Sequence, residues 1–238
     1  MKRPELPILY CDEEMVAVHK PAGLLVHRTY LERRESHFAL QLVRDQLGSR
    51  VYPAHRLDRP TSGVLLFARS RNVAGILGTM LQSGSVEKRY LALVRGWVEP
   101  HGVIDHPLVD LDATNNSATP PRQARTIYNM LERYELPFAV GRYPSSRYAL
   151  IELRPQSGRR HQLRRHMKHV FHPLIGDTNY GEGRHNRYFR EHFACHRLML
   201  AATSLSFAHP RSGTELAITC EPESSFTQVL TQLSRYRV

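Results

Sequence analysis

Long hydrophobic runs are absent from this sequence of 238 residues. No apolar stretch approaches the roughly 18 residues that a membrane span needs. The amino terminus, MKRPELPILYCDEE, also lacks the apolar core of a signal peptide, so we expect a cytoplasmic protein. Cysteine is scarce too. Cys11, Cys195 and Cys220 are odd in number and far apart, which argues against a disulfide framework and fits reduced thiols.

Acidic residues are outnumbered, with 22 Asp and Glu against 33 Lys and Arg and a net charge of +11. This balance favours a polyanionic partner such as a nucleic acid, although a basic surface that merely keeps the protein soluble would have the same net charge. Clustering of the charge favours the first interpretation. The larger cluster contains Arg159, Arg160, Arg164, Arg165 and Lys168, and a smaller one contains Arg28, Arg33 and Arg34.

Several familiar motifs are missing. Neither GxGxxG nor GxxxxGK[ST] occurs, so a nucleotide-phosphate fold has no support. His166 and His169 are three apart on a predicted helix, but no CxxC or HExxH spacing accompanies them or the other histidines. We therefore expect polar or RNA-facing histidines rather than a metal site.

Hydrophobic patterning predicts short strands, mostly joined as hairpins, with a few helices between them. Strands are expected at 8–11, 15–19, 64–68, 87–94, 126–133, 148–153, 204–208 and 216–220. Helices are expected after a cap at Ser36, between Ser70 and Gly84, at 161–170 and at 226–233, with a loop at 110–123. The segment 181–192 reads either as an RNA contact or as a surface loop. This order indicates an α+β fold on a mixed or antiparallel, hairpin-connected sheet.

The densest polar cluster is HRLDRPTSG at 55–63, followed by the apolar run VLLFA. It predicts a polar loop that leads into a buried strand. Asp58 lies between Arg56 and Arg59, so its carboxylate should stay ionised at neutral pH, as a nucleophile must. From the residues alone, the better interpretation is that Asp58 pairs with one of these arginines and stabilises a turn.

This cluster resembles the signature loop of the RluA-type pseudouridine synthases, whose aspartate is essential. Other segments match the family's motifs in the same order. They are KPAGLLVH at 20–27 with Asp12 before it, KRY at 88–90 with Gly96 beyond, SGRRHQLR at 157–164 with Asp177 following, and RLMLA at 197–201 with His209 and Pro210 after it. Ser157 replaces the family's usual Thr and keeps the hydroxyl.

The resemblance implies a single pseudouridine synthase catalytic domain over 1–238, without an S4-like amino-terminal module. It also implies that RNA is the partner, that uridine is isomerised after its base is flipped out, and that no metal or organic cofactor is needed. Asp58, Tyr90 and Arg164 would be the catalytic residues, with Tyr90 stacked on the uracil and Arg164 paired with Asp58. Without the motif, Tyr90 would read as a core aromatic and Arg164 as part of a solvated helix face.

Further residues would contact the substrate. Leu163 would pack beneath the base, and Arg56 would either fill the space that the base leaves or pair with a phosphate or carboxylate. The remaining candidates for phosphate contacts are Arg159, Arg160, Arg165 and Lys168.

The stretch 141–177 most resembles family members that act on tRNA, at uridine 65 in the T stem. Three rival interpretations stay open. One keeps the chemistry and makes 23S ribosomal RNA the substrate, alone or together with tRNA. The second is a non-catalytic RNA-binding protein, which would not require Asp58. The third and weakest is a metal-dependent nuclease or glycosidase that uses the histidines.

Overall fold

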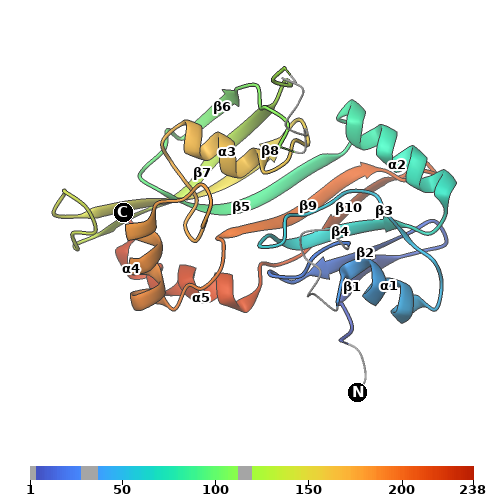
Figure 1. The fold of residues 1–238 in the computed structure, drawn as a ribbon, viewed down its shortest axis with the longest axis horizontal. Coiled ribbons are helices and arrows are strands. Elements are labelled where there is room, and N and C mark those ends of the chain that lie inside the picture. Colours follow the sequence, from blue (N-terminus) through green and yellow to red (C-terminus); the bar gives the residue numbers. More distant parts are fainter. Residues whose placement is uncertain (1–3, 28–36, 112–119) are drawn as a thin grey trace. The chain divides into compact units, whose positions relative to one another are not determined.

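The computed structural model describes residues 4–27, 37–111 and 120–238, and the chain divides into two compact units (Figure 1). The first unit comprises Met1–Lys88 and Ala201–Glu223, and the second comprises Arg89–Leu200 and Ser224–Val238. The basic cluster of Arg28, Arg33 and Arg34, the predicted cap Ser36 and most of the predicted loop at 110–123 lie outside the described residues. One catalytic domain over 1–238 stays a prediction.

A mixed sheet forms the centre of the first unit. Its strands are β1 (Ile8–Cys11), β2 (Met15–Lys20), β4 (Ser62–Ala68) and β9 (Leu200–Ala208), in that order, with β3 (Tyr52–Pro53) on β4 and β10 (Glu215–Thr219) on β9. The β4–β9 pair is parallel, and the other pairs of this unit are antiparallel. The predicted mixed sheet is therefore confirmed, whereas the short β3 was not expected.

Two helices belong to the first unit, α1 (Ala39–Leu47) and α2 (Arg71–Ser83). The predicted caps of α2 are confirmed, because the Ser70 hydroxyl accepts a hydrogen bond from the Val73 amide at 3.2 Å and Gly84 adopts the left-handed conformation. Val73 and Leu77 face the sheet and pack in one core with Leu66. Burial of this apolar stripe is what holds the helix on the sheet.

Asp12 and His209 join the β1–β2 turn to the β9–β10 turn. Asp12 accepts hydrogen bonds from the amides of Glu14 and Met15, each at 2.8 Å, and its other oxygen lies 2.8 Å from His209 Nε2. Nδ1 of His209 accepts the Ser212 amide at 3.1 Å. Burial alone would raise the pKa of Asp12, but a hydrogen bond from the Tyr10 hydroxyl, together with those from Met15, His209 and Glu14, holds it below its usual value. Two of the motif residues therefore have structural roles.

The second unit is built on an antiparallel sheet. Its strands follow the order β5 (Glu87–Arg95), β8 (Ser146–Pro155), β7 (Arg125–Leu136) and β6 (His101–Asp105). Helices α3 (Gln162–His169), α4 (Gly183–Phe193) and α5 (Ser224–Leu233) accompany it, and a 3-10 turn at Ser234–Tyr236 follows α5. The predicted α3 and α5 are confirmed, and β6 was missed.

Helix α4 replaces the surface loop that was one interpretation of 181–192. His185, Phe189 and Phe193 are spaced four apart, and all three are buried. Polar residues fill the positions between them, which weakens the helical periodicity in the sequence. No helix among the described residues is long and apolar enough to cross a membrane.

Candidate active site

The signature loop, residues 54–61, connects β3 to β4 in the first unit. Asp58 is half-buried, and its carbonyl oxygen accepts the Thr61 amide at 3.0 Å, which closes a turn directly before β4. Leu57, directly before Asp58, is buried and anchors the loop, whereas the preceding residue, Arg56, is exposed. Asp58 therefore lies on a short backbone turn that the buried Leu57 side chain holds in place.

Lys20 fixes this loop to the preceding motif. Its side chain is fully buried, and Nζ donates to the carbonyl oxygens of Pro21 at 2.9 Å, Leu24 at 2.8 Å and Arg59 at 3.2 Å. The Arg59 carbonyl oxygen also accepts a hydrogen bond from the Gly23 amide at 2.8 Å, and Arg59 Nε donates to the Gly23 carbonyl oxygen at 3.1 Å. A buried ammonium needs such partners, so Lys20 is a structural support for the Asp58 loop.

His55 begins the loop as a hydrogen-bond acceptor. Its Nε2 accepts the Leu66 amide at 3.2 Å, which assigns the proton of the neutral ring to Nδ1. Burial, together with the nearby Lys88 ammonium, lowers the pKa of His55 to about 4. Burial also lowers the pKa of Lys88. The histidine is thus neutral at physiological pH and ties the loop to β4.

Gly63 allows β4 and β9 to approach each other directly behind the loop. Its φ of 116° disfavours any side chain, and a Cβ there would overlap the backbone of Ala202. Gly63 and Ala202 are partners in the parallel ladder. The glycine of the signature motif is therefore required by the packing of the strand that follows Asp58.

Tyr90 packs against the apolar core of the second unit to which Leu163 belongs. Tyr90 lies on β5 opposite Leu153, is half-buried, and packs against an apolar core that includes Leu163. Leu163 is buried on the first turn of α3. This packing fits a core aromatic as well as a residue that stacks on uracil, so the stacking role stays a prediction.

Arg164 follows on the same turn of α3 and forms a buried pair with Asp177. Its Nε lies 2.7 Å from Oδ2 and its Nη2 lies 2.8 Å from Oδ1, with 5% and 0% of the two side chains exposed. Oδ1 also accepts the amides of Asn179 and Tyr180 at 2.9 Å and 3.0 Å. Burial would raise the pKa of Asp177, but the guanidinium and these amides hold it below its usual value.

Asp177 is the residue that the sequence did not assign. The motif match included it, but nothing in the spacing of 13 residues indicated that it pairs with Arg164. The default alternative for Arg164, a solvated helix face, is wrong, because its side chain is buried. The pairing of Arg164 with Asp58 stays a prediction.

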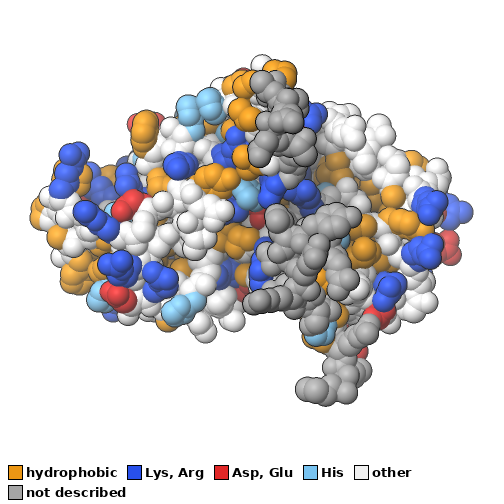
Figure 2. All heavy atoms as spheres, in the orientation of Figure 1, with side chains coloured by type: hydrophobic (Ala, Val, Ile, Leu, Met, Phe, Trp, Pro, Cys, Tyr) orange, Lys and Arg blue, Asp and Glu red, His pale blue; other side chains and the backbone are white. Residues whose placement is uncertain are grey.

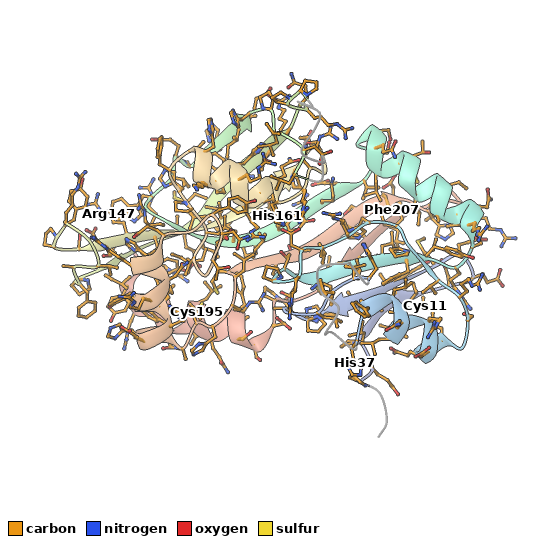
Figure 3. The ribbon with its side chains drawn as sticks, in the orientation of Figure 1. Cys11, His37, Arg147, His161, Cys195 and Phe207 are labelled. Atoms are coloured by element: carbon orange, nitrogen blue, oxygen red, sulfur yellow. The ribbon has the colours of Figure 1, made fainter. Side chains whose placement is uncertain are left out.

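Tyr180 completes the surroundings of Arg164. The guanidinium carbon lies 5.1 Å from the Tyr180 ring centre, and Lys168 Nζ lies 5.9 Å from it. The Tyr180 hydroxyl lies 2.9 Å from Nδ1 of His161, which begins α3 and is labelled in Figure 3. An ion pair on one side and an aromatic face on the other restrict Arg164 to one rotamer.

Gln162 explains another part of the motif. Its buried amide donates to the Arg125 carbonyl at 3.0 Å and to the Thr126 hydroxyl at 3.1 Å, and it accepts the Ser157 hydroxyl at 2.8 Å. These contacts connect the start of α3 to β7. The hydroxyl that Ser157 keeps in place of the family's usual Thr therefore has a structural partner in Gln162.

His166 is a buried structural residue, so of the two expectations, polar or RNA-facing, the RNA-facing one is wrong for it. Its Nδ1 lies 2.9 Å from the Thr126 hydroxyl and its Nε2 lies 3.0 Å from the His106 carbonyl oxygen. His169 is exposed and stacks on His106 with ring centres 3.7 Å apart. Within the described residues, no group of three His, Cys, Asp or Glu side chains could hold a metal ion.

The predicted phosphate contacts gather around α3. Arg165 donates to the Val109 carbonyl at 2.9 Å, and Arg159 donates to the Gln123 carbonyl at 3.1 Å. These contacts to neutral carbonyls position both side chains, and no acidic side chain within the described residues pairs with either of them. Arg160 is half-buried and Lys168 is exposed. Contacts of these four residues with RNA stay predictions, as does the role of Arg56.

Comparisons with known proteins agree on one family. The model described as RNA pseudouridylate synthase matches residues 14–169. A tRNA pseudouridine synthase C from Vibrio parahaemolyticus is 47% identical over 233 residues, covering 96% of this chain and 95% of that protein. Another from Haemophilus ducreyi is 46% identical and covers 96% of both chains. The solved structure of Human RNA Pseudouridylate Synthase Domain Containing 1 is 26% identical, with a TM-score of 0.68 over 94% of this chain and 86% of that one.

Proposed function

Because the chain belongs to the RNA pseudouridylate synthase family, we propose that it converts uridine to pseudouridine in tRNA, at position 65 of the T stem. The observation that carries the choice of tRNA is the similarity over nearly the whole chain to proteins named tRNA pseudouridine synthase C. The choice of uridine 65 rests on the resemblance of residues 141–177 to members that act there. The enzyme would meet this substrate in the cytoplasm.

Asp58 is the proposed catalytic carboxylate. The reaction breaks the N1–C1′ bond of uridine, turns the uracil and joins its C5 to C1′, so atoms and charge balance without a cofactor. Loss of the glycosidic bond develops positive charge at C1′, which a nearby carboxylate stabilises. Two routes suit Asp58: action at the ribose, by attack on C1′ or by assisting removal of a ribose proton to give a glycal, and attack on C6 of the ring.

Tyr90 and Arg164 would act beside it. Tyr90 would stack on the flipped uracil and relay the C5 proton once the base is rejoined. One edge of the Arg164 guanidinium binds Asp177, and a guanidinium can bind a second carboxylate through its other edge. In the proposed active site that second carboxylate is Asp58, whose rotamer the arginine would fix.

Base flipping requires that the enzyme hold the RNA backbone while one base leaves its stack, at a cost of a few kcal/mol. The basic residues on and before α3, together with Arg56, supply the charge for phosphate contacts. The ribosomal alternative would use the same chemistry, so only the substrate separates the two proposals.

The test is site-resolved pseudouridine mapping after incubation of the purified protein with tRNA and with 23S rRNA. We expect modification at position 65 of tRNA and none in a matched transcript with cytidine at that position. Pseudouridine in the rRNA alone would overturn the tRNA assignment. No pseudouridine in either RNA would overturn the proposed activity and favour a binding protein.

A further inference from the structure

Helix α4 has two chemically different faces. His185, Phe189 and Phe193 form the buried face, where Phe189 packs edge-on against Tyr148 with ring centres 4.8 Å apart. The Tyr148 hydroxyl lies 2.8 Å from Nδ1 of His185, so this face is fully satisfied inside the second unit. The outer face carries arginines at every third position. They are Arg184, Arg187 and Arg190, and all three are exposed.

These three arginines have no acidic side chain paired with them among the residues that the structure describes. Neighbouring arginines of the same unit do have such partners. Arg147, labelled in Figure 3, pairs with Glu135 at 3.2 Å and lies over the Trp97 ring, and Arg237 pairs with Glu132 at 2.7 Å. Like charges three or four apart destabilise a helix by a few tenths of a kcal/mol per pair. The stripe therefore costs stability, and no ion pair with a described residue of the unit offsets that cost.

Aromatic rings lie beside the stripe. Tyr188 on α4 has its ring centre 4.3 Å from that of His192 and 6.4 Å from that of Phe138, at the end of the β7–β8 hairpin. Phe138 is 45% exposed and also contacts Tyr236, with ring centres 6.2 Å apart. At the same hairpin end, Arg142 lies over the ring of Tyr143, which is 61% exposed. Exposed rings next to guanidinium groups are suited to stack on bases and ribose.

We propose that this surface, which we call the α4 surface, is a second RNA-binding site. It comprises Arg184, Arg187 and Arg190 together with the rings of Phe138, Tyr143, Tyr188 and Tyr236. Figure 2 shows several Lys and Arg side chains over this end of the second unit. The partner is the phosphate backbone of structured RNA, because an unpaired arginine stripe binds phosphates and the adjoining rings add a contact that an acidic protein surface would not need.

The inference rests on the proposed function in one respect: it identifies the bound RNA as the tRNA substrate. The α4 surface lies wholly in the second unit, whereas Asp58 belongs to the first. Its residues are assigned no part in the chemistry. They would supply affinity for the RNA around the target uridine. Substitution of the arginines of the α4 surface should therefore raise KM and leave kcat unchanged.

The experiment compares tRNA binding by the wild-type chain and by a triple variant with Arg184→Gln, Arg187→Gln and Arg190→Gln, over a range of salt concentrations. We expect the triple variant to bind at least about tenfold more weakly, with a slope of log Kd against log salt reduced by about two to three, one for each lost phosphate contact. Its melting temperature should not fall, because the three guanidinium groups form no ion pair with any residue that the structure describes.

The matched control removes the same charge from the first unit through Arg44→Gln, Arg50→Gln and Arg71→Gln, which are exposed positions. Equal affinities for the two triple variants would overturn the proposal, because net charge alone would then explain binding. Wild-type affinity for the α4 triple variant would overturn it too. Absence of pseudouridine in wild-type reactions would instead refute the proposed function, while the binding measurement decides the α4 surface by itself.

Discussion

Arg164 and Asp177 form a bidentate ion pair inside the second unit, with Nε to Oδ2 at 2.7 Å and Nη2 to Oδ1 at 2.8 Å. Such a pair is weak evidence for stability by itself, because burying two charges costs nearly as much as their attraction returns. Its value lies in geometry. The pair fixes the orientation of the one arginine that the proposed mechanism brings to the catalytic carboxylate.

Asp177→Asn should therefore impair both folding and catalysis. Removing one partner leaves the buried Arg164 charge uncompensated, which lowers the free energy of unfolding by about 3–5 kcal/mol. Misplacement of the guanidinium should lower kcat by roughly 100-fold. Urea unfolding and single-turnover kinetics measure the two effects. Asp105→Asn, at an exposed position of the same unit, should change stability by less than about 0.5 kcal/mol. Equal effects of the two variants would contradict the role of the pair.

Lys20→Met should loosen the Asp58 loop. The substitution keeps the length of the side chain but leaves the carbonyls of Pro21, Leu24 and Arg59 without the buried ammonium. Hydrogen bonds to charged donors contribute about 1.5–3 kcal/mol each, so we expect at least about 2 kcal/mol of destabilisation, together with a lower kcat. Thermal unfolding and activity assays provide the measurements. A variant with wild-type stability and kcat would refute the supporting role of Lys20.

Gly63→Ala and Gly75→Ala should have opposite signs. At Gly63 the methyl group would overlap the Ala202 backbone at a φ of 116°, so we expect destabilisation of at least about 3 kcal/mol and loss of activity. Gly75 is exposed on α2 with nothing near its Cβ position, so alanine there should stabilise the fold by about 0.5–1 kcal/mol. Chemical denaturation of both variants tests the close approach of β4 and β9. Equal stability of Gly63→Ala and Gly75→Ala would contradict the close approach of these two strands.

Acid should weaken the fold before the carboxylates titrate. The folded pKa of His55, about 4, lies below the unfolded value near 6.5, so the unfolded chain binds an extra proton between these pH values. The His55 contribution to stability is therefore fully present above pH 6.5 and falls by up to about 3 kcal/mol as the pH drops to 4. Asp12 and Asp177 have lowered folded pKa values, so their contribution is lost only below the unfolded value near 4.

His55→Asn isolates this effect, because asparagine can still accept the Leu66 amide but does not titrate. The variant should lose the His55 share of the decline in unfolding free energy between pH 6.5 and 4, as measured by urea denaturation at several pH values. The lowered pKa values of His106, His166 and His185 should keep the rest of the decline. An unchanged pH dependence would show that His55 is not the group responsible.

Local sequence signals were sufficient to predict elements whose ends and buried face depend only on neighbouring residues. The Ser70 cap, the apolar stripe of α2 and Gly84 predicted that helix almost to its ends, because each acts within one or two turns. Helix α4 was missed, since the arginines between His185, Phe189 and Phe193 dilute the periodicity that those three residues carry. The signal was present in their spacing of four.

The candidate active site shows the same contrast between what neighbouring residues indicate and what depends on the fold. The motif identified Asp58, Tyr90 and Arg164 as a set, whereas the Arg164–Asp177 pair depends on how the chain returns to α3 after 13 residues, which spacing alone does not indicate. Lys20 and Gln162 belong to the motifs that match the family, and His166 was expected to be polar or RNA-facing. The structure gives each of them buried hydrogen-bond partners within its own unit.

The central claim is that Asp58 performs the chemistry. The most direct measurement is tritium release from tRNA labelled at C5 of uridine, with wild-type protein and Asp58→Ala, alongside tRNA binding by both. The account predicts that Asp58→Ala releases no tritium above background while its affinity for tRNA stays close to that of the wild type. Tritium release by Asp58→Ala at a rate near that of the wild type would contradict it.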